Sequence, residues 1–226
     1  RNARTWSALY QQRPAPEEGD YFKAEWLKPY EGKPPARETL RVYGGSDYAV
    51  TADGGDYTVH AVVGLDPEGR MYLLDLWRKQ AASDVWIEAF CDLVKEHRPM
   101  SWSAEKGQIA SGIGPYLTRR QRERRAYVVI ETFPTRGDKA VRAQSIRGRM
   151  ALEGLYVPIN APWFPEFRSE LMSFPAGKND DIVDALGLVG QLLDQMQAGS
   201  KPRPQEKPRR DRWDREPEST DSWKVL

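Results

Sequence analysis

Residues 40–77 read LRVYGGSDYAVTADGGDYTVHAVVGLDPEGRMYLLDLW. Three runs in this stretch, residues 40–51, 57–66 and 70–77, are rich in β-branched and aromatic residues. Turns containing Gly and Asp separate them. Runs of this kind with short connections are typical of neighbouring antiparallel strands. The stretch therefore predicts a three-stranded antiparallel meander.

The chain beyond residue 77 alternates between the helical and the extended pattern. Apolar spacing predicts helices at residues 84–97, 113–124, 139–153 and 180–196, with strands at residues 101–104 and 127–132. Three antiparallel strands followed by alternating helices and strands predict an α/β fold. We expect a mixed β-sheet with helices on both faces.

The composition limits the class of protein. The 226 residues include 34 basic and 33 acidic ones, and the single cysteine excludes a disulfide framework and a Cys-based zinc site. No apolar run is long enough for a membrane span, so we expect no membrane partner. Basic and acidic residues cluster separately, which suits a polyanion-binding surface around an acidic, metal-loaded centre.

Residues 179–186 read NDDIVDAL and carry three carboxylates at the start of an apolar helix. At 3.6 residues per turn, Asp181 and Asp184 share one helix face. Like charges this close repel each other, and a divalent cation such as Mg²⁺ or Mn²⁺ would relieve the repulsion. The alternative is an acidic first turn that complements the helix dipole, with one Asp as the cap.

Two further acids stand where predicted strands end. Asp47 closes the first strand, and Glu105 follows the strand at residues 101–104. Carboxylates at strand ends and at a helix start can meet at one edge of a sheet, which is a metal-site geometry. Alternatively, Asp47 is a turn residue beside Gly44 and Gly45, and Glu105 is a surface residue paired with Lys106.

This order of acids resembles that of the ribonuclease H-like nucleases. More narrowly, the chain is similar to the C-terminal nuclease domain of the large terminase subunit of tailed bacteriophages. The similarity lies in WSALYQQRP at residues 6–14, in SDYA and DYT at residues 46–49 and 56–58, in MYLLDLWR at residues 71–78, and in GKNDDIVDAL at residues 177–186.

The resemblance implies a metal-dependent endonuclease with a ribonuclease H-like fold. Such an enzyme cuts concatemeric double-stranded DNA with little sequence specificity, by hydrolysis with two divalent metal ions, Mg²⁺ or Mn²⁺. Its implied partners are double-stranded DNA, a portal protein, a small terminase subunit and an N-terminal ATPase domain. It would act in the host cell cytoplasm during phage assembly, at the procapsid portal.

The resemblance also implies a division of the chain. Residues 1–38 would be a connector from a missing N-terminal ATPase motor domain, residues 39–197 the nuclease domain, and residues 198–226 a disordered charged tail. The sequence has no Gly-rich phosphate loop followed by Lys and Ser or Thr, so we expect no ATPase activity from it.

Roles for individual residues follow from the resemblance. Asp47, Glu105 and Asp181 are the predicted catalytic residues, and all three are also predicted metal ligands together with Asp184. Asp180 and Asp56 would contact the metal ligands without binding the metal themselves. The predicted DNA-binding residues are Lys106, Lys139, Arg142, Arg147 and Arg149, although a solvated helix face would explain the last four.

Two other functions remain open from the sequence. The chain would also suit a ribonuclease H-like nuclease of the resolvase or transposase type, acting on branched or end-joined DNA. In a third interpretation, the fold serves as a non-catalytic module that docks DNA or a portal protein.

Overall fold

The computed structural model describes residues 19, 21–30, 33–49, 55–134 and 139–198. The strands are β1 (Leu27–Tyr30), β2 (Arg41–Asp47), β3 (Thr58–Leu65), β4 (Met71–Lys79), β5 (Ser101–Lys106), β6 (Ile130–Pro134) and β7 (Leu155–Pro158). The helices are α2 (Ser83–His97), α3 (Gln108–Arg124), α4 (Lys139–Glu153), α5 (Phe164–Ser173) and α6 (Asp181–Ala198), with short 3₁₀ turns η1 (Ala24–Trp26) and η2 (Arg37–Thr39).

The strands form one mixed sheet in the order β1-β7-β4-β3-β2-β5-β6. The pairs β2–β3 and β3–β4 are antiparallel, whereas β5 pairs parallel to both β2 and β6. The predicted meander is therefore confirmed, and so is the α/β fold class with its mixed sheet. β2 lies inside the sheet, between β3 and β5.

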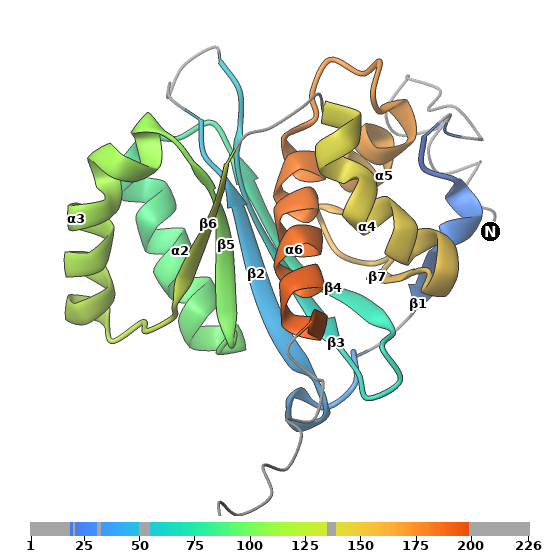
Figure 1. Cartoon of the computed structure of the whole chain (residues 1–226), viewed down its shortest axis with the longest axis horizontal. Coiled ribbons are helices and arrows are strands. Elements are labelled where there is room, and N and C mark those ends of the chain that lie inside the picture. Colours follow the sequence, from blue (N-terminus) through green and yellow to red (C-terminus); the bar gives the residue numbers. More distant parts are fainter. Residues whose placement is uncertain (1–18, 20, 31–32, 50–54, 135–138, 199–226) are drawn as a thin grey trace, which may run out of the picture.

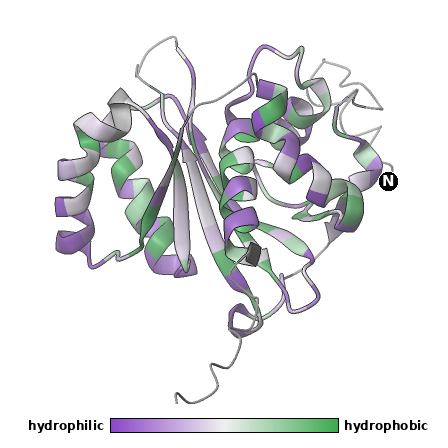
Figure 2. Cartoon of the chain, viewed as in Figure 1, coloured by the Kyte–Doolittle hydropathy of each residue, from purple (hydrophilic) through white to green (hydrophobic). Residues whose placement is uncertain are grey.

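Helices cover both faces of this sheet (Figure 1). One face carries α2 and α3, and the other carries α4, α5 and α6, with α6 lying directly on β2, β3 and β5. Each face has its own buried apolar cluster. Figure 2 shows the central strands mostly apolar to neutral, while hydrophilic residues gather on the outer side of α3.

Two glycines let the layers approach closely around α6. A Cβ added to Gly45 in β2 would lie 2.6 Å from a methyl of Val189 and 2.7 Å from the carbonyl oxygen of Ala185. One added to Gly190 would lie 2.7 Å from the backbone nitrogen of Ile146 in α4. These contacts leave no space for a side chain, so the glycines hold α6 tightly between β2 and α4. Gly45 is thus a packing residue within a strand and not a turn residue.

The folded unit begins earlier than the predicted boundary at residue 39. Strand β1 pairs parallel to β7 at the sheet edge, and Phe22 is fully buried in the core. Aromatic burial and edge pairing, which the Pro- and charge-rich composition hides, draw this segment into the domain. Residues 6–14 and the tail at 199–226 lie outside the described residues.

The remaining predicted elements are confirmed with shifted ends. The helix at residues 139–153 coincides with α4, whereas α3 begins at Gln108, earlier than predicted, and β6 begins at Ile130, later than predicted. β1, β7 and α5 were not predicted. Within the described part of the chain, no helix combines the length and the apolar character needed to cross a bilayer.

Candidate metal and nuclease site

The topology brings three predicted acids to one end of the sheet. Asp47 ends β2, and Glu105 lies one residue before the end of β5, directly after the register pair Ser46–Ala104. α6 crosses this face and begins at the same end, with Asp184 in its first turn. Neighbouring strand ends and a helix start therefore place acids from three distant segments side by side.

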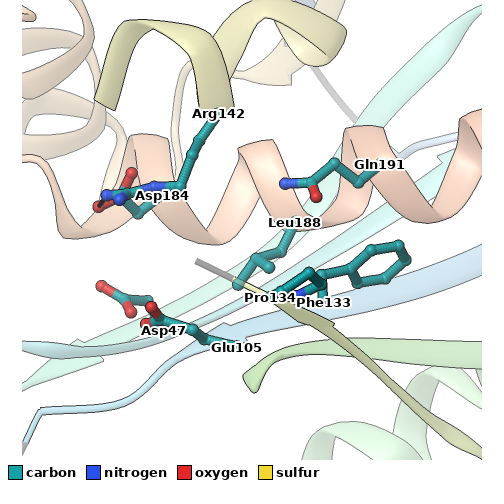
Figure 3. A pocket seen from close by; sticks show the side chains of 8 residues that line it. All are labelled: Asp47, Glu105, Phe133, Pro134, Arg142, Asp184, Leu188 and Gln191. Carbon is teal, nitrogen blue, oxygen red and sulfur yellow. Dashed lines mark hydrogen bonds and ion pairs between the residues drawn. The ribbon is translucent and has the colours of Figure 1, made fainter. Parts of the chain in front are cut away.

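These acids line one small pocket, which we call the acidic pocket (Figure 3). In the close-up, Asp47 and Glu105 lie next to each other on the sheet, and Asp184 lies on α6 above them. Arg142 comes from α4 and completes the upper wall. The apolar side of the pocket is formed by Phe133, Pro134 and Leu188, with Gln191 beside them.

The electrostatics of the pocket centre on Asp47. Burial raises the pKa of this carboxyl well above its usual range, and the nearby carboxylates of Asp184, Asp181, Glu105 and Asp180 raise it further, in that order. Four acids therefore oppose the ionisation of one carboxyl. Such mutual repulsion between buried carboxylates is the electrostatic condition that a bound cation relieves.

Two basic residues of α4 partly offset this charge. Arg142 Nη2 donates a hydrogen bond to Asp184 Oδ2 at 2.8 Å, and Lys139 forms an ion pair with Asp180. Burial still keeps the pKa of Asp184 above its usual range, against the opposing effect of Arg142. Asp180 also accepts the Asp184 N–H through its own backbone oxygen, at 2.9 Å.

Asp181 faces a different set of partners, although it lies in the same helical turn. Its Oδ2 is 3.8 Å from Arg78 Nη2, and its carboxylate accepts the backbone N–H of Tyr57. The pKa of Asp181 is raised to about 6. Burial is the largest cause, the nearby Arg78 opposes it, and the exposed Asp56 adds to it. Asp181 does not line the acidic pocket, so the structure separates the two helix acids that the sequence grouped together.

The donor set of the acidic pocket fits a divalent metal ion. Asp184 Oδ1, in this pocket, is buried without a hydrogen-bond partner among the described residues. A buried carboxylate oxygen without a partner is costly, and hard divalent cations prefer carboxylate oxygen. The residues present are therefore suited to hold such an ion.

A second group with metal-ligand chemistry lies elsewhere. Potential ligand atoms of Asp75, Glu96 and His97 all lie within 4.8 Å of one another, and among the described residues no other set of three His, Cys, Asp or Glu meets this criterion. The acids of the acidic pocket are thus more widely spaced. However, Glu96 is exposed, and the half-buried His97 Nε2 already hydrogen-bonds Asp75 Oδ2 at 3.2 Å, so two of the three groups are partners of each other.

The predicted DNA-binding residues do not form one exposed ridge. Arg147 donates to the carbonyl oxygen of Tyr21 at 2.9 Å and lies over the rings of Tyr21 and Trp26. Arg149 pairs with Asp194 at 2.7 Å on α6. Lys139 and Arg142 lie at the acidic pocket as described above, and Lys106, the residue after Glu105 in β5, is exposed. Two of the five thus lie at the acidic pocket, two pack elsewhere, and Lys106 is exposed at the strand end.

Sequence reasoning missed two residues near the first turn of α6. Glu170 of α5 is 6% exposed and accepts the Ile182 N–H at 2.6 Å, and burial raises its pKa to about 7. Arg78 of β4 lies between Glu170 and Asp181. Arg78 stood within a quoted motif, MYLLDLWR, but its spacing gave no sign that it would meet α5 and α6.

The fold of this chain recurs in solved terminase nuclease domains. The large terminase nuclease of thermophilic phage G20c with bound magnesium has a TM-score of 0.51 at 17% identity, covering 71% of this chain and 84% of that one. The Thermus phage P74-26 large terminase nuclease domain has a TM-score of 0.50 at 18% identity, covering 72% and 87%. The human cytomegalovirus terminase nuclease domain, manganese-soaked and inhibitor-bound, has a TM-score of 0.54 at 14% identity, covering 73% and 88%.

These similarities define the fold as ribonuclease H-like, as in terminase nuclease domains, which confirms the fold expected from the sequence. No protein-family model matches the chain, and no curated protein matches it. At such low identity the similarity establishes the fold alone. The function must therefore be argued from the residues of the acidic pocket.

Proposed function

We propose that this chain is a divalent-metal-dependent endonuclease domain that cuts double-stranded DNA. The observation that supports this best is the acidic pocket, where Asp47, Glu105 and Asp184 meet from β2, β5 and α6. A cluster of half-buried acids that neighbouring cations offset only in part destabilises a fold, so its presence at one sheet edge points to a function. The terminase nucleases with the same fold include structures with magnesium bound and manganese soaked.

In this proposal Asp47, Glu105 and Asp184 hold the metal ions. Asp47 is the most rigidly placed, because its strand has partners on both sides. Asp184 replaces Asp181 as the principal helix ligand, since Asp184 lines the acidic pocket. Asp181 remains a fourth ligand candidate, because it still acts on the Asp47 pKa from its position beside Arg78.

Two divalent ions, when bound, would supply an activated water and neutralise charge on the scissile phosphate. The chain itself contributes position and counter-charge. Arg142 and Lys139 pair with Asp184 and Asp180, so a phosphodiester that approaches the acidic pocket meets cationic side chains. Contacts of this type bind the DNA backbone without reading its sequence, which supports cleavage with little sequence preference.

The biological role that this activity would serve is viral genome packaging. A terminase nuclease would cut concatemeric DNA at the procapsid portal in the host cytoplasm. It would act with an N-terminal ATPase domain, a portal protein and a small terminase subunit. The shared fold and the acidic motif at residues 177–186 support this role.

Cleavage of supercoiled plasmid tests the proposal. With Mg²⁺ or Mn²⁺, we expect the wild-type chain to produce nicked and linear DNA, and we expect a chelator or the substitution Asp47→Ala to abolish both products. Asp75→Ala is the matched control, because Asp75 belongs to the other group of potential ligands. Cleavage that survives both chelation and Asp47→Ala would contradict the proposal.

A further inference from the structure

We propose that Glu170 and Arg78 are positioning residues that hold the first turn of α6, and thereby aim Asp181 and Asp184. This inference rests on the proposed function for the role of the two aspartates. Neither Glu170 nor Arg78 lines the acidic pocket, so they act through the helix and not on the substrate.

Glu170 acts as a cap for α6 from another helix. The first N–H groups of a helix have no partner inside it. Glu170 Oε1 accepts the N–H of Ile182 at 2.6 Å, and its carboxylate also accepts that of Val183. These two amides lie between Asp181 and Asp184 in the chain. The cap therefore fixes the backbone from which both acidic side chains project.

Arg78 supplies the counter-charge that makes a buried Glu170 acceptable. Its Nη2 lies 3.4 Å from Glu170 Oε2 and 3.8 Å from Asp181 Oδ2, and the guanidinium stacks over the Tyr57 ring at 3.5 Å from the ring centroid. Arg78 is itself only 10% exposed and stands on β4 within the sheet. The pair thus ties α5 and α6 to a rigid strand.

The consequence is a mechanical link between the sheet and the acids of α6. Asp47 and Glu105 are placed by strand pairing, whereas Asp184 is placed by the orientation of a helix end. Catalytic geometry is sensitive to displacements of about 1 Å. The Arg78–Glu170 pair fixes the position of the α6 N-terminus relative to the sheet.

The experiment compares Glu170→Ala and Glu170→Gln in the full 226-residue chain. Amide exchange at Ile182 and Val183 reports the cap, and Mn²⁺ binding followed by electron paramagnetic resonance reports the aspartates. We expect Glu170→Ala to speed exchange at both amides and to weaken Mn²⁺ binding by about 10- to 100-fold, as for residues that orient metal ligands. Glu170→Gln keeps an acceptor oxygen and should restore most of both.

Two control variants separate positioning from general stability. Glu166→Ala removes an exposed acid one turn earlier on α5, 3.9 Å from Arg78, and should change neither readout. Leu171→Val truncates a fully buried neighbour of Glu170 and should lower the melting temperature while leaving Mn²⁺ affinity unchanged. Amides near Leu192, far along α6, should keep their protection in Glu170→Ala.

Glu170→Ala with wild-type exchange and wild-type Mn²⁺ affinity would overturn the inference. Equal loss of Mn²⁺ affinity in Leu171→Val would overturn it as well, since destabilisation alone would then explain the effect. If the wild-type chain binds no Mn²⁺, the proposed function fails. Exchange at Ile182 and Val183 then decides separately whether Glu170 holds the helix end, and unchanged exchange overturns that too.

Discussion

Ser46 and Asp47 are adjacent in β2, yet they lie in opposite kinds of polar environment. Successive strand residues point to opposite faces of a sheet. Ser46 points toward α2, where Trp102 Nε1 donates to its Oγ at 2.7 Å and the hydroxyl donates to His60 Nδ1 at 2.7 Å. His60 Nε2 then donates to the carbonyl oxygen of Trp86 at 2.9 Å. This chain of bonds, which we call the serine network, is buried and satisfied throughout.

Asp47 points toward α6, where burial and the neighbouring acids raise its pKa and where Asp184 Oδ1 is buried without a hydrogen-bond partner among the described residues. The two regions lie at the same strand end; the serine network is fully buried, and Asp47, Glu105 and Asp184 are half-buried. The difference is whether each polar group has found its complement within the chain. The serine network stabilises the fold by itself, whereas in our proposal a divalent cation from outside completes the acidic pocket.

The largest effect we expect is on catalysis at the acidic pocket. Asp184→Asn should lower the plasmid cleavage rate by about 10³-fold, roughly 4 kcal/mol of transition-state stabilisation, because it removes a charged ligand. His60→Gln is the matched change in the serine network, and it should cleave normally at temperatures where it is folded. Comparable cleavage by Asp184→Asn and wild type would remove the functional side of the comparison.

The next effect concerns the pH dependence of stability. The contributions of the two regions to it have opposite signs. Burial lowers the His60 pKa from 6.5 to about 4, so His60 stabilises the fold fully above pH 6.5 and loses this contribution as pH falls through 4. The loss amounts to roughly 3 kcal/mol. Asp47, whose pKa is raised, favours the fold at low pH and loses that contribution as pH rises through its folded-state pKa.

Denaturant unfolding between pH 4 and 7 measures both contributions. In metal-free protein, His60→Gln should flatten the loss of stability below pH 6.5, and Asp47→Asn should steepen it, because the opposing acid is gone. An unchanged pH profile in His60→Gln would show that the histidine is not held neutral by burial.

A smaller effect should separate the adjacent residues of β2 directly. Ser46→Ala leaves His60 Nδ1 and Trp102 Nε1 without their partner and should cost about 2 kcal/mol of unfolding free energy. Asp47→Asn should leave the melting temperature of metal-free protein unchanged or higher, because it removes one of several repelling charges. Melting curves without metal test this pair, and a larger loss in Asp47→Asn would reverse our assignment.

The smallest effect is expected at the partly exposed group formed by Asp75, Glu96 and His97. Asp75→Asn should change stability by less than about 0.5 kcal/mol and leave Mn²⁺ affinity unchanged, since partly exposed ion pairs contribute little. Titration with Mn²⁺ checks this. Loss of the main binding event in Asp75→Asn would move the metal site away from the acidic pocket.

The fold was predictable where local signals were strong. The meander follows from β-rich runs between turns. Helix α4 follows from its apolar spacing, and its ends agree with the predicted ones. β7 was missed because it has four residues and ends in Pro158, and β1 because charge and proline hide its edge position. β6 starts late because Tyr127 and Val129, which look β-prone, are exposed before the strand begins.

The convergence of Asp47, Glu105 and the α6 acids could also be predicted, because strand ends and a helix start meet at one edge of such a sheet. The separation of Asp181 from Asp184 could not be predicted from the sequence. It depends on Arg78 and Arg142, whose approach is set by the packing of β4 and α4 against α6. The sequence also could not show that Arg147 packs against Tyr21, because this contact joins segments that are far apart in the chain. Arg147 was therefore predicted to bind DNA.

Anomalous diffraction from a crystal of this chain soaked in Mn²⁺ tests the central claim most directly. We predict manganese peaks in the acidic pocket, within bonding distance of Asp47, Glu105 and Asp184, with the Arg142–Asp184 pair rearranged to admit the ion. A pocket without manganese, or manganese bound solely at Asp75, Glu96 and His97, would contradict it.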